Sequence, residues 1–208
     1  MAKIKHTKTE LKAQMDALAR FQRFLPMLQL KKQQLQAEIM AITARIEEVD
    51  AKAGATADSM ASWAALLGGG ELPEGAARLS RVVTDTGNIA GVVIPVYRSI
   101  EIERADFDLF ETPSWFDDAQ DAIASLLALR AESAVLARQR ELISQELHTT
   151  SQRVNLFEKV KIPACKDNIR EIRIFINDEQ TAAVARGKIA KGRGASTGSA
   201  TPDGEDAA

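Results

Sequence analysis

The chain has 208 residues and a net charge of −2, with 5% aromatic and 27% charged residues. This composition favours long helices over a compact core, and the near-neutral charge argues against a polybasic nucleic-acid-binding protein. A single cysteine, Cys165, excludes an internal disulfide and fits a reducing compartment. No stretch is apolar enough to span a bilayer, so we expect a cytoplasmic protein without direct membrane insertion.

One heptad repeat runs through the first 53 residues and predicts an amino-terminal coiled-coil helix over residues 1–60. A seven-residue repeat keeps a narrow apolar seam on one side of a helix. Fifty residues would span about 75 Å, and such a helix cannot cover its own seam. Apart from Lys32, every a and d position between Leu18 and Val49 is apolar. The predicted seam residues are Leu18, Leu25, Leu28, Leu35, Ile39, Ile42, Ile46 and Val49.

The start of this helix carries a capping signal and an excess of positive charge. Thr7 and Glu10 have the spacing of a capping box, so we expect the helix to begin near Thr7 or Thr9. Because the heptad register continues on both sides of Pro26, we interpret this proline as a kink and not a terminus. Residues 1–32 contain eight Lys or Arg and two Asp or Glu. The basic candidates for partner contacts are Lys5, Lys8, Lys12, Arg20 and Arg23.

The middle segment, residues 61–113, changes from helical to strand-like periodicity. Two stretches rich in β-branched residues within about 79–104 flank the turn formers of 86–90, which predicts a β-hairpin. Pro95 lies inside the second strand and therefore predicts an edge or a bulge. An isolated hairpin is marginally stable in water, so it should pack on the helices or on a partner. Candidates for that contact are Trp63, Tyr97, Phe107 and Phe110.

A second heptad run predicts a carboxyl-terminal coiled-coil helix over residues 114–186. Ser114 or Thr112 is the expected cap, with Asp117 and Asp118 in the first turn. Beyond Pro163 the 3–4 spacing returns in a shifted phase at Ile169, Ile172 and Ile176. Residues 187–208 are rich in small and polar residues and are expected to be disordered. The seam residues are Leu126, Leu129, Leu136, Ile143, Leu147, Val154 and Phe157.

Two long helices joined by a compact segment pack most simply as an antiparallel coiled coil, each covering the other's seam. The predicted fold is therefore mainly α, with a short β-hairpin and small helical elements in the middle. We expect residues whose numbers sum to about 174 to lie at similar heights. This places Lys32 near Arg140, and because two cations repel, a carboxylate should share their layer: Glu38, Glu141 or Glu146.

The sequence contains no complete motif for catalysis. Gly68–Gly70 lacks a following Lys-Ser/Thr, and Gly187-Lys188 lacks the upstream glycine of a phosphate-binding loop. Two distant histidines and one cysteine do not make a metal cluster. We therefore expect no catalytic residues, no cofactor and no metal. The basic amino-terminal residues are either a solvated face or a surface for complementary charge, and without interleaved aromatic residues they do not predict nucleic-acid binding.

Three stretches resemble the D subunit of the V-type and A-type rotary ATPases. Near the amino terminus, residues 6–11 and 27–32 read His-Thr-Lys-Thr-Glu-Leu and Met-Leu-Gln-Leu-Lys-Lys. In the middle, residues 88–95 are similar to the family's Asn-Ile-x-Gly-Val-x-Ile-Pro, which is the most specific match. In the second helix, residues 153–158 and Ile162-Pro163 resemble Arg-Val-Asn-Ala-Leu-Glu and Ile-Pro. The added candidates for partner contacts are Asn88, Ile89, Gly91, Ile94, Pro95, Arg153 and Asn155.

The resemblance implies a central rotor shaft that does no chemistry itself. Its partners would be the catalytic and regulatory subunits around the shaft, the small F subunit of the central stalk and the adaptor on the membrane ring. ATP hydrolysis or synthesis would be coupled to H⁺ or Na⁺ transport, with the chain cytoplasmic and peripheral to the membrane. The alternative is a non-rotary structural coiled-coil adaptor, which explains the heptads equally well but not the motif at 88–95.

Overall fold

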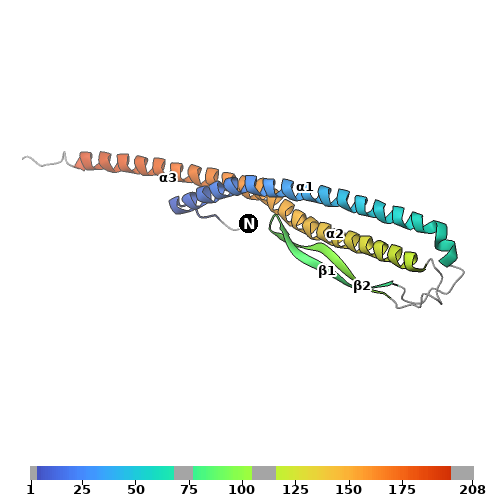
Figure 1. Cartoon of the computed structure of the whole chain (residues 1–208). Helices are drawn as coiled ribbons and strands as arrows, with labels where there is room; N and C mark the ends of the chain where they lie inside the picture. The colour runs from blue at the N-terminus through green and yellow to red at the C-terminus, as the bar shows by residue number, and fades with distance from the viewer. Residues whose placement is uncertain (1–3, 68–76, 105–115, 198–208) are drawn as a thin grey trace, which may run out of the picture. The chain divides into compact units, whose positions relative to one another are not determined.

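The computed structural model describes residues 4–67, 77–104 and 116–197. These residues form a mainly helical structure with one two-stranded antiparallel sheet, which confirms the predicted fold class (Figure 1). The elements in chain order are α1 (Lys8–Leu67), β1 (Ala77–Ile89), β2 (Val92–Arg104), α2 (Phe116–Leu156), the π-helical turn η1 (Phe157–Lys161) and α3 (Ile162–Thr197).

The chain divides into two compact units, each built from amino-terminal and carboxyl-terminal segments. The terminal unit consists of Met1–Met27 and Val154–Ala208, and the hairpin unit consists of Leu28–Arg153. In both units the contacts between helices run antiparallel, as predicted. Lys31 contacts Glu146 and Arg45 contacts Glu132 in the hairpin unit, and His6 contacts Glu171 while Phe21 contacts Phe157 in the terminal unit.

The amino-terminal cap agrees with the sequence pattern. The Oγ1 atom of Thr7 accepts a hydrogen bond of 3.2 Å from the backbone N–H of Glu10, which satisfies one of the unpaired donors of the first turn. Helix α1 then continues without interruption past the exposed Pro26. The prediction that this proline does not end the helix is confirmed.

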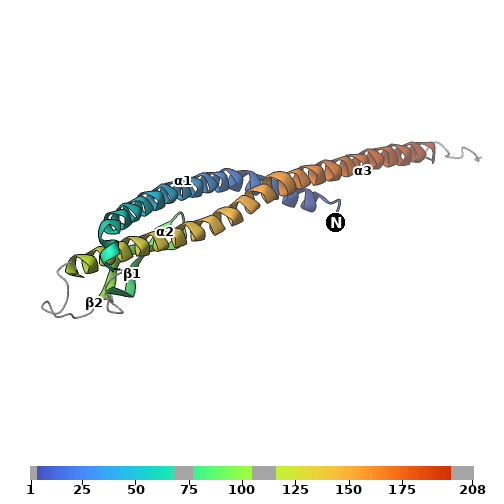
Figure 2. The same cartoon turned by 90° about the vertical axis from the view of Figure 1, so that its right-hand side faces the viewer.

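The hairpin unit has a core to which three elements contribute. Leu35 and Ile42 come from α1, Ile94 from β2 and Ile143 from α2, and each is at least nine-tenths buried. In both views the hairpin lies alongside α2 (Figure 1, Figure 2). A two-stranded sheet has too few apolar contacts to be stable alone, so its stability depends on inserting Ile94 between the helices.

The hairpin turn is tighter than the sequence indicated. We expected residues 86–90 to form a loop, but β1 continues to Ile89 and only Ala90 and Gly91 connect the strands. Their φ angles are 51° and 86°, and positive φ at both central residues is the pattern of the type I′ turn that suits twisted strands. The pairing shifts between Val83 and Thr84, which marks an irregularity of the β-bulge kind.

The predicted seam residues lie inside their units. All fifteen of them are buried or half-buried, and Leu35 and Ile143 have no exposed surface. Arg140 is exposed and Lys32 half-buried. Of the three carboxylates predicted for their layer, Glu146 contacts Lys31, the residue before Lys32. The pairs Lys31–Glu146 and Arg45–Glu132 both have numbers that sum to 177, close to the predicted 174.

In the terminal unit, η1 changes the phase of the seam by one residue. The backbone N–H of Ile162 bonds to the carbonyl of Phe157, five residues back instead of four. The wider turn comes directly before Pro163, whose ring would clash with the preceding turn of a regular α-helix. Lys161 and Ala164, the next positions of the heptad repeat, are therefore exposed. The buried or half-buried positions after η1 are instead Ile162, Cys165, Ile169, Ile172 and Ile176.

Several expectations differ from the structure or lie outside it. We expected disorder from Gly187, but α3 continues to Thr197, since the Ala, Lys and Arg residues of this stretch favour helix enough to tolerate its glycines. Residues 198–208 lie outside the described residues, as do the expected caps Thr112 and Ser114, Phe107 and Phe110. The side chain of Trp63 is also outside them, whereas Tyr97 is half-buried on the hairpin.

Replacing Leu35 by alanine tests the core of the hairpin unit. Leu35→Ala should reduce the free energy of unfolding by about 2–5 kcal/mol, because it removes apolar contacts and leaves a cavity. The matched control is Leu30→Ala, since Leu30 lies on the same helix but is 57% exposed. Its effect should stay within about 0.5 kcal/mol. Urea denaturation of the purified chain measures both, and equal losses would contradict the packing described above.

The hairpin turn gives a second prediction, in which one substitution has opposite effects at two sites. Gly91→Ala should destabilise the chain by about 1–2 kcal/mol, because alanine is strained at positive φ. Gly54 lies inside α1, with open space where a Cβ would stand. Gly54→Ala should therefore stabilise the chain by about 0.5–1 kcal/mol. Thermal denaturation measures the change in Tm of each variant relative to the unsubstituted chain. If the turn did not require positive φ, the two changes would have the same sign.

Candidate functional site

The hairpin turn is held in place by its own side chains and by α2. The Oδ1 atom of Asn88 accepts a hydrogen bond of 2.9 Å from the backbone N–H of Gly91. The side-chain amide of Gln139 on α2 donates to the carbonyl of Pro95. Because proline has no N–H, its carbonyl is the only backbone group of Pro95 that can form a hydrogen bond. The turn and the strand after it are thereby fixed against α2.

These contacts assign different roles to the residues of the 88–95 motif. Ile94 is 3% exposed and belongs to the core, so this side chain is not available to a partner. Ile89 is half-buried and packs against the same core, and Pro95 is half-buried beside α2. Asn88 and Gly91 are exposed at the turn, and their role as partner contacts stays a prediction.

Gln139 was not among the sequence candidates, although it is a buried polar residue with 7% exposure. A buried amide must find a hydrogen-bond partner or lose free energy. The carbonyl of Pro95 supplies that partner from a strand 44 residues away. The heptad pattern gave no signal for it, because the residue lies beside the seam and not on it.

The basic candidates near the amino terminus all lie on the outside of the terminal unit. Lys5, Lys8, Lys12, Arg20 and Arg23 are exposed, and within the described parts of the chain none of them forms an ion pair. Their charges are therefore not neutralised by neighbouring carboxylates in these ranges. Arg153 and Asn155, the candidates of the second helix, are exposed as well.

Two ion pairs cross between the helices of the hairpin unit. The Nζ atom of Lys31 donates to Glu146 at 2.7 Å, and an Nη atom of Arg45 lies 3.2 Å from Glu132. The hydrogen bond from Lys31 is the main cause that lowers the pKa of Glu146 below its usual value. Burial, with the negative charge of Glu132 nearby, raises the pKa of Tyr97. The Lys31–Glu146 and Arg45–Glu132 ion pairs fix the register of α1 against α2 at the edge of the seam.

The terminal unit is joined by polar and aromatic contacts. His6 lies 3.0 Å from a carboxylate oxygen of Glu171, and its ring stacks on Phe175 with centroids 4.8 Å apart. Phe21 and Phe157 approach to 5.1 Å between centroids, a separation typical of favourable ring pairs. The residues before α1 are therefore tied to α3.

The described side chains offer neither a metal site nor a membrane span. Among residues 4–67, 77–104 and 116–197, no group of three or more His, Cys, Asp or Glu side chains could hold a metal ion. None of the helices in these ranges is long and apolar enough to cross a membrane. The described residues thus define a mainly helical protein in which a β-hairpin packs on two antiparallel helices.

Comparison with known proteins identifies the family. A family model for the D subunit of ATP synthase matches residues 10–192. The chain is 44% identical over 191 residues to the D subunit of the V-type ATP synthase of Borreliella burgdorferi, covering 92% of this chain and 95% of the relative. It is 31% identical over 194 residues to that of Chlamydia caviae (91% and 93%) and 30% identical over 194 residues to that of Chlamydia pneumoniae (90% and 91%).

The chain belongs to the family of ATP synthase D subunits. The resemblance drawn from the three sequence motifs is therefore confirmed. Membership makes the chain a subunit of a multisubunit V-type rotary ATPase.

The Lys31–Glu146 pair makes stability depend on pH. Because the pKa of Glu146 is lowered in the folded chain, the stabilisation is present above its unfolded pKa of about 4.5 and disappears as pH falls through the folded pKa. Glu146→Gln should cost up to about 1 kcal/mol at pH 7, and the difference from the unsubstituted chain should vanish in acid. Urea denaturation at several pH values measures this difference.

The control for this experiment is Glu47→Gln, which removes an exposed carboxylate of α1 that has no ion pair among the described residues. It should leave the pH profile of stability unchanged. A pH-independent loss in Glu146→Gln would show that the substitution acts through packing and not through charge.

Proposed function

We propose that this chain is the central-stalk rotor shaft of a V-type rotary ATPase. It would couple ATP hydrolysis or synthesis in the catalytic hexamer to rotation of the membrane ring and to H⁺ or Na⁺ transport, without catalysing a reaction itself. Its partners would be the catalytic and regulatory subunits, the small F subunit of the central stalk and the adaptor on the membrane ring. The chain would lie in the cytoplasm, peripheral to the membrane. The observation that carries the proposal is the match of nearly the whole chain to the D subunit of V-type ATP synthases.

The packing of the helices supports this role because a shaft transmits torque only if it resists twisting. Helix α1 is continuous from Lys8 to Leu67, and its seam residues are buried or half-buried inside each unit. Close-packed interiors deform little, so twisting one helix requires moving the other. Cross-helix ion pairs and the anchored hairpin add connections at the edge of the seam in the hairpin unit.

The exposed surface also suits a part that turns against its neighbours. The side chains of α3 from Asn177 to Arg193 are all exposed and include four cations, Arg186, Lys188, Lys191 and Arg193. Charged, hydrated side chains make few deep contacts, and complementary charge gives long-range attraction without a fixed fit. Such a surface is compatible with successive rotational positions.

A cleavable covalent link between shaft and hexamer tests rotation directly. Val184 on α3 is 59% exposed. In the purified ATPase complex, Val184→Cys should be coupled to a neighbouring subunit by a disulfide-containing thiol–amine cross-linker. If the chain rotates, the link should stop most ATP hydrolysis, and reduction of the linker should restore it. ATP hydrolysis is measured before cross-linking, after it and after reduction.

The control is the complex with the unsubstituted chain and the same reagent. Its single thiol, Cys165, is buried, and burial raises the pKa of that thiol, so it should not react. A static adaptor would tolerate a covalent link without loss of turnover. Full ATP hydrolysis by a complex whose link is demonstrated on a gel would therefore exclude rotation of this chain.

A further inference from the structure

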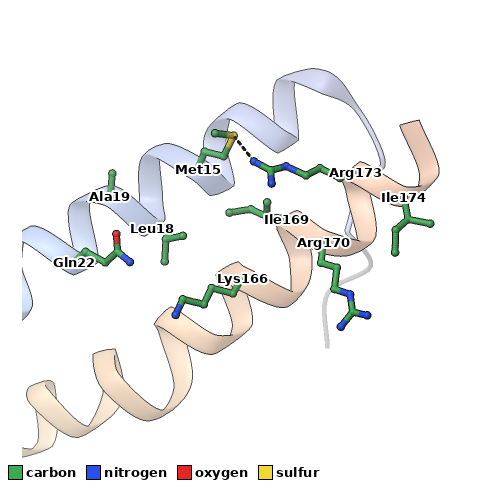
Figure 3. A pocket seen from close by; sticks show the side chains of 9 residues that line it. All are labelled: Met15, Leu18, Ala19, Gln22, Lys166, Ile169, Arg170, Arg173 and Ile174. Atoms are coloured by element: carbon green, nitrogen blue, oxygen red, sulfur yellow. Dashed lines mark hydrogen bonds between the residues drawn. The ribbon is translucent and has the colours of Figure 1, made fainter. Parts of the chain in front are cut away.

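A groove runs between α1 and α3 in the terminal unit, with a cavity volume of about 520 Å³ (Figure 3). Met15, Leu18, Ala19 and Gln22 line it from α1, at spacings of three and four residues that place them on one helical face. Leu18 and Ile169 point into the space between the helices (Figure 3). Each wall spans about two helical turns, or about 12 Å.

The floor of the groove is apolar and open to solvent. Ile169 is buried at its base, while Met15 remains 44% exposed and Ile174 54% exposed. These exposed apolar side chains lie in a concave site and not singly on a convex surface. An apolar surface of this kind, rimmed by polar residues, is a common feature of protein interaction sites.

The α3 wall carries three cations and the groove lining contains no carboxylate. Lys166, Arg170 and Arg173 alternate with the apolar residues along one face. Within the described parts of the chain none of the three forms an ion pair. The guanidinium of Arg173 lies 3.9 Å from the sulfur of Met15 (Figure 3), and sulfur is only a weak acceptor. The positive charge of the groove is therefore not balanced by a carboxylate of the groove lining.

We propose that this groove binds an acidic amphipathic helix of another subunit of the complex. A helix of about two turns fits the length of the walls, with its apolar face on Met15, Leu18 and Ile174. Its Asp or Glu residues would face the three cations of α3. This is the helix-in-groove mode of recognition, in which apolar contacts supply affinity and complementary charge selects the partner. The proposal rests on the proposed function only in placing the chain inside an assembled ATPase.

The occupant can be identified by photo-cross-linking in the purified complex. Ile174→p-benzoylphenylalanine places a photoreactive group at the rim of the groove. Irradiation should join this chain to a second subunit, and mass spectrometry should locate the link in a helical segment with Asp or Glu beside an apolar stripe. The same replacement of Val160, which is 53% exposed and does not line the groove, should not yield that product.

Charge reversal tests the electrostatic part of the proposal. Lys166→Glu with Arg170→Glu, added to the photoreactive chain, should lower the yield of the product about tenfold, as expected for a loss of about 1.4 kcal/mol. The matched control reverses Lys159 and Lys161, two exposed cations of η1 that do not line the groove, and should leave the yield unchanged. Circular dichroism of the purified chains checks that both double variants keep their helical content.

The outcomes separate this proposal from the rotor function. A link to a basic or neutral segment, a link to a second copy of this chain, or no product at position 174 would each overturn it. Equal losses in the two double variants would show general charge dependence and no specific groove. The rotation test uses Val184 and ATP hydrolysis, so the two experiments can fail independently. A photo-cross-link to an acidic helix, with ATP hydrolysis unaffected by the link at Val184, would refute the rotor function and support the groove. Arrest of ATP hydrolysis without the photo-cross-linked product would support the rotor function and refute the groove.

Discussion

The burial of Ile94 between Leu35, Ile42 and Ile143 is the contact on which the hairpin unit depends. Each neighbour comes from a helix with an incomplete apolar seam, and the hairpin has too little core of its own. One β-branched side chain from β2 therefore joins three elements that would each be marginal alone. The nearby hydrogen bond from Gln139 to Pro95 then fixes the strand in one orientation. Apolar contacts supply the free energy, and the polar contact makes the arrangement unique.

The helices were largely predictable because their seams repeat. Heptad spacing identified fifteen inward residues, since a helix that buries one side must repeat its apolar residues at its own period. The hairpin was visible from β-branched residues, but the two-residue turn was not. Positive φ at Ala90 is an unfavourable local state that the strand register and core packing impose. Gln139 gave no signal for a similar reason, because its partner lies 44 residues away.

The candidate site was predicted less completely, because the sequence of a motif does not show which of its side chains are buried in the core and which face solvent. Ile94 was expected to face a partner and instead fills the core. The basic residues near the amino terminus are exposed, but the cations of the groove come from α3, where the apolar spacing indicates only the inward positions. They become a single feature when the antiparallel packing places them beside Met15 and Leu18. The periodicity of one helix does not show which residues of another helix will lie beside it, so the groove could not be predicted from the sequence.

The one extra residue in η1 sets the angular position of everything that follows it. A residue of α-helix corresponds to a rotation of about 100°. Without the wide turn, the repeat that passes through Val154 and Phe157 would have pointed Asn168, Glu171 and Phe175 inward. A carboxylate would then occupy the place that Ile172 fills with no exposed surface, and the ring of Phe175 would leave His6. The π-helical turn thus acts as a fixed rotational offset, which keeps Ile169 and Ile172 of α3 buried and leaves the cations of the groove exposed.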